Sequence, residues 1–220
     1  MDCEEYMESS SKVVNGKRRL GYEFTKRLFD IVASLCALVV LSPVLLIVAI
    51  AVKAQDGGDV IFAQNRCTKN GKEFRMYKFR SMCMDAEARL HKVQCFNEMS
   101  GPAFKMKDDP RITKVGHFIR HTSLDELPQL VNVLKGDMSI IGPRPPLPRE
   151  VAQYNAYQMH RLDVKAGLAC YHECMGRNLI KDFDQWVEMD LQYIRERGPW
   201  TDLKIMLKTI GAVITRKGAE

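Results

Sequence analysis

The residues best suited to chemistry are two adjacent carboxylates and an arginine held between prolines. Asp125 and Glu126 lie at the start of a predicted helix, and Arg144 follows soon after that helix ends, in the segment Pro143-Arg144-Pro145. Acidic side chains beside a fixed cation, near a helix N-terminus, can hold a phosphate and a metal ion. Because prolines stiffen the backbone around Arg144, its guanidinium suits bidentate recognition of a phosphate. This stretch is therefore the candidate active site.

A purely structural interpretation of the two acids is also open. The apolar spacing from Leu124 to Leu134 predicts a helix that begins after Ser123 and ends before Gly136. Ser123 and Glu126 then match a capping box, and acids in a first turn interact favourably with the helix dipole. The local pattern favours this structural role, whereas the nearby arginine and the stiff segment around it favour a chemical role.

An uncharged run of 22 residues extends from Ile31 to Val52. About 20 apolar residues are needed to cross the hydrocarbon core of a bilayer. The run is apolar around the whole helix rather than on one face, which favours a membrane segment over the core helix of a soluble protein. We predict a membrane-inserted element over residues 17–55, after a flexible tail over residues 1–16.

The pair Ser42-Pro43 falls near the middle of this run and predicts a break in the helix. Proline removes one helical hydrogen bond and clashes with the preceding turn. Cations flank the run on both sides, and cationic flanks tend to remain cytoplasmic. This mildly favours a re-entrant helix that leaves by the face it entered, while a kinked spanning helix stays open from the residues alone.

Three charged residues stand at the edge of the membrane segment. Lys26 and Arg27 lie one helical turn before Asp30. The plain interpretation is an ion pair at the membrane interface, and the sharper one is a docking point for a lipid head group. With Ser42 and Pro43 they form the candidate lipid-binding set.

A basic hairpin is predicted after the membrane segment. Strands are expected at residues 60–62 and 74–79, separated by Asn70-Gly71, a strong hairpin signal. Six cations lie between positions 66 and 80, against one acid. They fit either a solvated surface or a site near anionic lipid or a nucleotide diphosphate, and we favour the functional role for Lys78 and Arg80. The strand aromatics Phe74, Tyr77 and Phe79 fit a buried face better than a base-stacking surface.

Composition restricts the class of protein only loosely. The 220 residues carry 33 Lys and Arg against 27 Asp and Glu, a formal charge of +6 that suits nucleic acid, anionic lipid or phosphorylated small molecules alike. The seven cysteines form no framework and no secretory signal precedes them, so we expect reduced thiols on the cytosolic side. Further helices are predicted over residues 84–96, 111–120, 151–162, 183–194 and from 200 onward, with a loop at 97–110.

Several motifs occur in the order seen in the bacterial sugar transferases: KRLFDI, Ser42-Pro43, YKFRSM, DDPRIT, TSLDELPQL, NVLKGDMS and GPRP. The chain most closely resembles the small monotopic phosphoglycosyl transferases, over about residues 17–207. We expect no additional membrane domain before this region, as in the minimal catalytic core of that family. The resemblance implies an α/β fold, mostly helical with a small β-hairpin, in which residues 17–55 form a re-entrant helix and residues 56–220 a cytoplasmic catalytic domain with interfacial helices.

The resemblance also implies a reaction. A UDP-sugar would donate sugar-1-phosphate to a polyprenyl phosphate, such as undecaprenyl phosphate, at the cytoplasmic face of the bacterial inner membrane, with release of UMP. Asp125 would be the nucleophile that forms a covalent phosphosugar, Glu126 would hold Mg²⁺, and Arg144 would bind phosphate. We assign substrate binding to Arg144 and to its flanking prolines, Pro143 and Pro145. Three further cations belong to the same predicted set: Arg120, Lys78 and Arg80. The expected partners are the two substrates and membrane lipid, and we expect no binding of nucleic acid. Protein partners would be a second copy of the chain or downstream glycosyltransferases.

One segment departs from the family pattern. Cys170, His172 and Cys174 stand where other residues are commoner, while Gly176-Arg177 are retained. Three such ligands without a CxxC pair are a weak zinc signal, so we favour loop residues or a variation of the sugar pocket. The sequence does not identify the sugar, the pathway or the oligomeric state. It also leaves open whether the last helix lies on the membrane or packs on the core. The competing hypothesis is a basic membrane-anchored module that binds anionic lipid or nucleic acid, with the acids acting only as helix caps.

Overall fold

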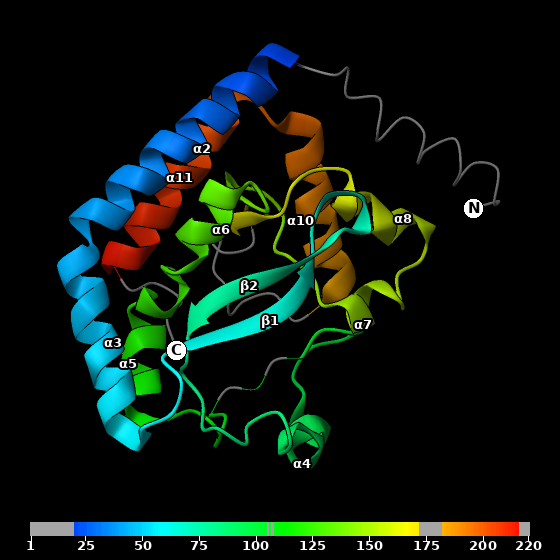
Figure 1. Ribbon diagram of the computed structural model, residues 1–220. Coiled ribbons are helices and arrows are strands. Elements are labelled where there is room, and N and C mark those ends of the chain that lie inside the picture. The colour runs from blue at the N-terminus through cyan, green and yellow to red at the C-terminus, as the bar shows by residue number, and fades with distance from the viewer. Residues whose placement is uncertain (1–19, 105, 107, 172–181, 216–220) are drawn as a thin grey trace.

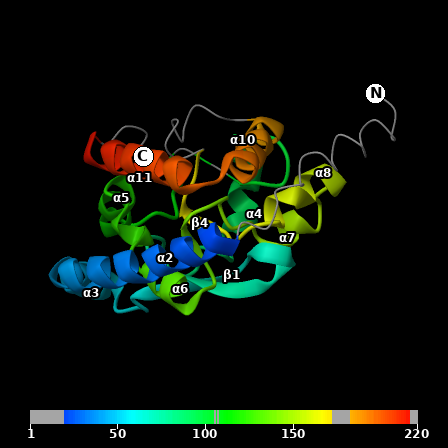
Figure 2. The same ribbon diagram turned by 90° about the horizontal axis from the view of Figure 1, so that it is seen from above.

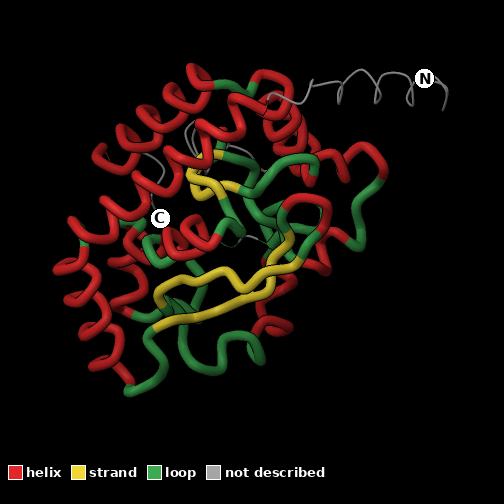
Figure 3. Tube along the Cα trace, turned by 45° about the horizontal axis from the view of Figure 1, so that its top comes forward, coloured by secondary structure: helices red, strands yellow, loops and turns green. Residues whose placement is uncertain are grey.

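The computed structural model of the protein describes residues 20–104, 106, 108–171 and 182–215. The predicted tail, the cations at 17–19 and the segment from His172 to Arg177 lie outside these residues. The described chain is mostly helical and contains two small sheets, which confirms the predicted fold class. Figure 3 shows two separate strand pairs in yellow, a short one among helices and a longer hairpin bordered by loops.

A bent pair of helices forms one side of the molecule (Figures 1 and 2). Helix α2 spans Leu20–Val40 and helix α3 spans Ser42–Asp56, with Pro43 in the first turn of α3. No single described helix has the length and apolar character to span a bilayer, but α2 and α3 pass that test together and meet at an angle of 64°. The break predicted at Ser42-Pro43 is therefore present.

The outer face of this pair is apolar and exposed. Large side chains on it are half or more exposed, among them Phe24, Leu28, Val32, Leu35, Val39, Val40, Leu46, Ile47 and Ile50. Its inner face packs on the rest of the protein, where Val48 and Val52 join Phe79 and Ile119 in a buried cluster. The pair thus has one face in the core and one that lacks an apolar partner among the described residues.

The basic hairpin is present and longer than predicted. Strand β1, Ile61–Cys67, pairs antiparallel with β2, Glu73–Phe79. The turn contains Asn70 and Gly71, both with positive φ, inside the short 3₁₀ segment η1, Lys69–Gly71. Phe74 and Phe79 are both buried, as expected, but they lie on opposite faces of β2, where Phe74 packs with Met76 and Phe79 with Val48 and Ile119.

A second sheet has two parallel strands, β3 (Ser139–Ile141) and β4 (Gly167–Ala169). The backbones approach closely just beyond β3, since a Cβ atom at Gly167 would lie 2.0 Å from the Gly142 nitrogen. The Gly142 N–H donates to Ala169 O (3.0 Å) and the Gly167 N–H to Pro143 O (2.8 Å). These contacts place the loop that carries Arg144 against β4.

Two predicted helices are broken into short pieces. The segment 84–96 forms turns, then α4 (Leu90–Val93) and η2 (Gln94–Phe96). The segment 151–162 divides into α7 (Pro148–Val151), α8 (Ala156–Met159) and η4 (His160–Leu162), because Asn155 caps a new helix there.

The remaining helices follow the predictions more closely. Helix α5 covers Lys114–His121, with the Thr113 side chain accepting from the Gly116 N–H at its start, and α10 covers Phe183–Glu196. Phe183, Trp186, Val187 and Ile194 of α10 are buried in the largest core cluster, as their spacing predicts. Helix α11, Pro199–Thr215, buries Ile205, while Trp200, Leu207 and Ile210 are exposed.

Candidate active site

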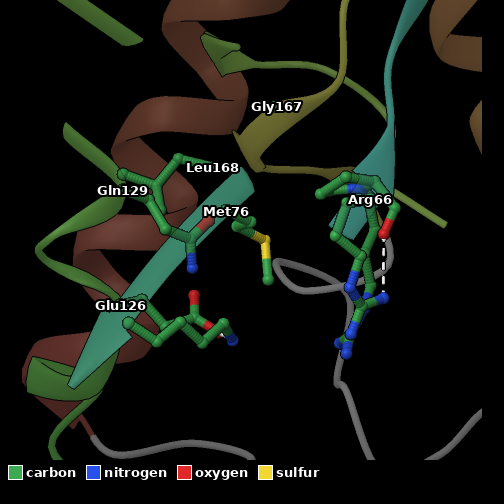
Figure 4. Close-up of a pocket in the computed structure, with 9 residues that line it drawn as sticks. Arg66, Met76, Glu126, Gln129, Gly167 and Leu168 are labelled. Atoms are coloured by element: carbon green, nitrogen blue, oxygen red, sulfur yellow. Dashed lines mark hydrogen bonds and ion pairs between the residues drawn. The ribbon is translucent and has the colours of Figure 1, made fainter. Parts of the chain in front are cut away.

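A hollow in the protein surface collects side chains from four segments. The hairpin contributes Arg66, Met76 and Lys78, and the acidic turn with the start of the following helix contributes Glu126 and Gln129. The loop after β3 contributes Arg144 and Pro145, and β4 contributes Gly167 and Leu168. Figure 4 shows Glu126 and Arg66 on opposite sides, with Met76 between them. Three cations and one carboxylate therefore surround one small space.

The hairpin presents its cations to the hollow because of its register. Phe62 pairs with Lys78, Gln64 with Met76 and Arg66 with Phe74. Directly opposed residues share a face of the sheet, and alternate residues of one strand do so too. Arg66, Met76 and Lys78 therefore lie on one face, while Arg75 lies on the other and is exposed.

The two acids lie in a 3₁₀ turn, η3 (Leu124–Glu126), rather than inside the predicted helix. Ser123 has φ 56° and its side chain makes no capping hydrogen bond, so the predicted capping box is wrong. The following helix, α6 (Gln129–Lys135), starts only after Pro128. Proline tolerates the start of a helix but not its interior, which explains the separation of η3 from α6.

Glu126 faces the hollow and meets a cation there. Lys78 Nζ lies 2.8 Å from Glu126 Oε1, and both side chains are partly buried. This ion pair links the hairpin to the acidic turn. Asp125 is only 7% exposed and does not line the hollow, since the 3₁₀ turn directs neighbouring side chains in different directions.

Arg144 projects from a loop fixed on both sides by backbone hydrogen bonds. Pro143 O accepts from Gly167 on the β4 side, while Pro146 O accepts from the Cys67 N–H (2.8 Å) on the hairpin side. Pro143 and Pro145 are buried. The predicted rigid cation is thus present, and the prolines act through their carbonyl oxygens and their packing.

The Arg144 guanidinium lies over an aromatic ring. Its carbon is 5.8 Å from the centroid of the Trp186 ring of α10. Within the part of the chain that the structure describes, Arg144 has no hydrogen bond or ion pair, so its donors are available to a ligand in the hollow.

Arg80 and Arg120 are not brought to the hollow. Arg80 is 9% exposed and forms two hydrogen bonds with Asp56, with a further one from Nε to Asp59 O at 2.6 Å. This interaction joins β2 to the end of α3. Arg120 lies half-buried in α5, at the end away from its N-cap.

The charged residues of α2 do not pair with one another. Lys26 contacts Asp202 of α11 at 2.6 Å, and the Ile140 N–H donates to Asp30 at 3.0 Å. Arg27 donates to the carbonyls of Val133 (2.6 Å) and Leu134 (2.8 Å), at the end of α6. The interpretation of these three as a mutual ion pair is therefore wrong, because each satisfies a polar group of a different element.

Ser42 and Pro43 lie on the exposed bend between α2 and α3. The Ser42 hydroxyl donates to Val39 O at 2.8 Å, which satisfies one carbonyl at the end of α2. Neither residue lines the hollow.

Five residues of the hollow escaped the prediction from sequence, namely Arg66, Met76, Gln129, Gly167 and Leu168. Arg66 belonged to a basic group that was not resolved further, and only the strand register shows that it shares a face with Lys78. Gln129 is 3% exposed. A polar residue on the apolar side of a helix is visible in the sequence, and this signal could have marked Gln129 as a site residue. Gly167 enters through the parallel pairing of β3 and β4, which nothing local in the sequence indicates.

The acidic turn is compatible with a magnesium ion. Mg²⁺ usually takes one or two carboxylates, with its other positions filled by water and substrate phosphates. Glu126 offers one carboxylate at the hollow, and Asp125 is the residue directly before it in the chain. No cluster of three or more His, Cys, Asp or Glu side chains suited to a metal occurs within the described ranges, so a site built from protein ligands alone is not present there.

Comparison with known proteins identifies the family to which the chain is similar. The bacterial sugar transferase family matches residues 21–216. The galactosyl transferase CpsE of Streptococcus agalactiae is 47% identical over 195 residues, 89% of this chain and 43% of the relative. The undecaprenyl-phosphate galactose phosphotransferase of Salmonella typhimurium is 40% identical, over 94% of this chain and 44% of the relative.

A shorter relative is matched over most of its length. The exopolysaccharide production protein ExoY of Rhizobium meliloti is 36% identical over 88% of this chain and 87% of the relative. The chain spans less than half the length of the two longer relatives. Since the family match covers nearly all of the described residues, the chain belongs to the bacterial sugar transferase family.

Proposed function

We propose that this protein transfers sugar-1-phosphate from a UDP-sugar to undecaprenyl phosphate and releases UMP. The observation that carries the proposal is the single hollow in which Glu126 and Lys78 face Arg66 and Arg144. Clustered cations suit a diphosphate, and a carboxylate beside them suits a metal bound to that diphosphate. Similar proteins are named for transfer of galactose, N-acetylgalactosamine or glucose phosphate to undecaprenyl phosphate.

The reaction proceeds in two displacements at the β-phosphorus of the donor. A carboxylate oxygen of Asp125 attacks this phosphorus, a new P–O bond forms, and the bond to the bridging oxygen breaks so that UMP departs with it. The acceptor phosphate then attacks the same phosphorus and restores the Asp125 carboxylate. A covalent intermediate divides one difficult step into two easier ones. Because Asp125 is buried, donor binding must open its access to the hollow.

The neighbouring charges lower the barrier to an attack of one anion on another. Arg144 stabilises negative charge on the diphosphate and on departing UMP. Glu126 would hold Mg²⁺, which when bound neutralises phosphate charge. Lys78 pairs with Glu126 at 2.8 Å in the free protein, and its ammonium group lines the hollow where it can bind a phosphate oxygen of the donor.

We further propose that α2 and α3 enter and leave the cytoplasmic face of the bacterial inner membrane as a re-entrant pair. Their exposed apolar face and their bend of 64° support this arrangement. Both ends of the pair also contact the same globular part: Lys26 reaches Asp202, and Val52 packs in a cluster with Ile119. A spanning helix would carry its two ends to opposite sides of the membrane.

Purified protein incubated with UDP-sugars and undecaprenyl phosphate tests the proposal, with UMP release as the readout. The wild type should release UMP with at least one sugar, and Asp125→Asn should abolish release without changing the thermal unfolding temperature. Asp108→Asn, an exposed carboxylate change, is the matched control. Turnover retained by Asp125→Asn would rule out the nucleophile assignment. A phosphosugar adduct on Asp125, detected by mass spectrometry without acceptor, would support the covalent route.

A further inference from the structure

Building on the proposed function, we infer that Arg66 is a second guanidinium ligand for the diphosphate of the donor, acting together with Arg144. Both side chains line the same hollow, Arg66 from β1 and Arg144 from the loop after β3. Figure 4 shows the Arg66 side chain extending along one wall, across from Glu126.

Arg66 is attached to the very loop that carries Arg144. Its Nη1 donates to Pro145 O at 3.0 Å, and its Nη2 donates to the Gln64 side chain at 2.9 Å. The neighbouring Cys67 N–H donates to Pro146 O. Strand β1 and the proline loop are thus fixed to each other, which holds together the backbone segments that carry the two arginines.

The donors of Arg66 are only partly used. An arginine side chain carries five N–H donors. Two of them have the acceptors named above, and Nε is a buried atom with no partner among the described residues. No carboxylate pairs with Arg66 in the described part of the chain. Glu150 acts on Arg66 only through its charge, without direct contact. A partly buried guanidinium with no carboxylate in direct contact is costly, which indicates that an anionic ligand completes the site.

The two arginines also repel each other in the free protein. Burial and, after it, the positive charge of Arg144 lower the pKa of Arg66 to about 10, while the carboxylate of Glu150 acts in the opposite direction. An anion between them would relieve both effects. Two guanidinium forks that line one hollow suit two linked phosphates better than a single phosphate, because each fork can bind its own group.

Binding of UDP and UMP, without acceptor lipid, tests the inference by isothermal titration calorimetry. Arg66→Gln should weaken UDP binding by about 10- to 100-fold, since hydrogen bonds to a charged group are lost. UMP affinity should change much less, because UMP lacks the second phosphate. Arg66→Lys, which keeps the charge but not the fork, should give an intermediate loss for UDP. Arg75→Gln on the opposite face of the hairpin is the matched control and should bind UDP as the wild type does.

A measurement on the wild type covers the case in which Arg66→Gln does not fold. UDP should protect Arg66 and Arg144 from modification by phenylglyoxal, mapped by mass spectrometry, while Arg75 stays reactive. Equal modification of Arg66 with and without UDP would overturn the inference, as would an unchanged UDP affinity in a folded Arg66→Gln variant. Equal losses for UDP and UMP would overturn the diphosphate assignment. A wild type that binds no UDP and releases no UMP would instead remove the proposed function itself.

Discussion

Asp125 and Glu126 are neighbours in the sequence, yet their surroundings differ. Glu126 faces the hollow and meets Lys78, whereas Asp125 is buried beside it. The acidic pair and Arg144 could be recognised from residue types and spacing. The capping interpretation failed because Ser123 takes a left-handed conformation and Pro128 delays the helix. Both are local backbone choices that a helical pattern of apolar residues does not reveal.

Trp186 positions the Arg144 guanidinium, so changing its ring should lower activity. We expect Trp186→Leu to reduce kcat/KM by about 3- to 30-fold, the value of a cation–π contact in a partly desolvated site. Trp186→Phe should recover part of the loss, because an aromatic face remains. UMP release under initial-rate conditions is the measurement.

Phe183→Leu is the matched control for this prediction. Phe183 packs against Trp186 in the same core cluster but lies over Arg161 rather than Arg144. It should lower the unfolding temperature and leave kcat/KM nearly unchanged. A similar fall in kcat/KM for both leucine variants would attribute the effect to packing rather than to Arg144.

At the scale of elements, Arg80 acts as a connector between β2 and the end of α3. Its hydrogen bonds lower the pKa of Asp56 to about 2, below the usual 3.8. A carboxyl group whose pKa is lower in the folded than in the unfolded protein stabilises the fold when the pH is above its unfolded-state pKa. That contribution is lost as the pH falls through its folded-state pKa. The stabilising effect should therefore be present above about pH 4 and disappear toward pH 2.

Urea unfolding of the wild type and Asp56→Asn between pH 2 and pH 5 checks this. The wild type should be the more stable at pH 5, and the difference should shrink as the pH approaches 2. For Asp108→Asn, the difference in unfolding free energy from the wild type should not change comparably with pH. A difference that stays constant over the whole range would contradict the role of the Asp56 carboxylate.

The close approach of Gly142 and Gly167 positions the loop that carries Arg144. A Cβ atom at Gly167 would meet the Gly142 backbone at 2.0 Å, so Gly167→Ala must displace one of the two strands. We expect a stability loss of about 1–3 kcal/mol and a loss of UMP release beyond what unfolding accounts for. Gly211→Ala is the control, because nothing lies within 4 Å of its Cβ. That change should leave activity intact and stabilise α11 slightly.

Elements with a long periodic pattern were predictable, and short ones were not. The apolar spacing of α10 and the uncharged run of α2 and α3 give a signal over several turns. The segments 84–96 and 151–162 carry weaker patterns, and local capping at Asn155 breaks the second. The parallel pairing of β3 with β4 joins residues far apart in sequence, so no local rule could supply it.

At the scale of the whole molecule, exposed apolar side chains gather on α2, α3 and α11, together with Trp200 at the start of α11. Asp202 ties these parts together, since Tyr22 and Lys26 of α2 and Tyr193 of α10 all contact it. On α11, Leu207 is 59% and Ile210 49% exposed, whereas Ile205 is buried in the core. We therefore expect one side of α11 to lie at the membrane interface while Ile205 holds the other side in the core.

The re-entrant arrangement makes a labelling prediction that depends on which cysteines are accessible. Cys67 is buried, and burial raises the pKa of its thiol, so a maleimide reports poorly on that position.

Cys95 is exposed, and Leu20 at the start of α2 is 73% exposed. With Cys95 or Leu20→Cys as the reactive thiol, an impermeant maleimide should label both positions in inside-out vesicles and neither in intact spheroplasts. Leu46→Cys should react only after detergent is added, because its side chain faces the acyl chains. Labelling of Leu20→Cys from the outer face and of Cys95 from the inner face would establish a spanning helix, since the two ends of α2–α3 would then lie on opposite sides of the membrane.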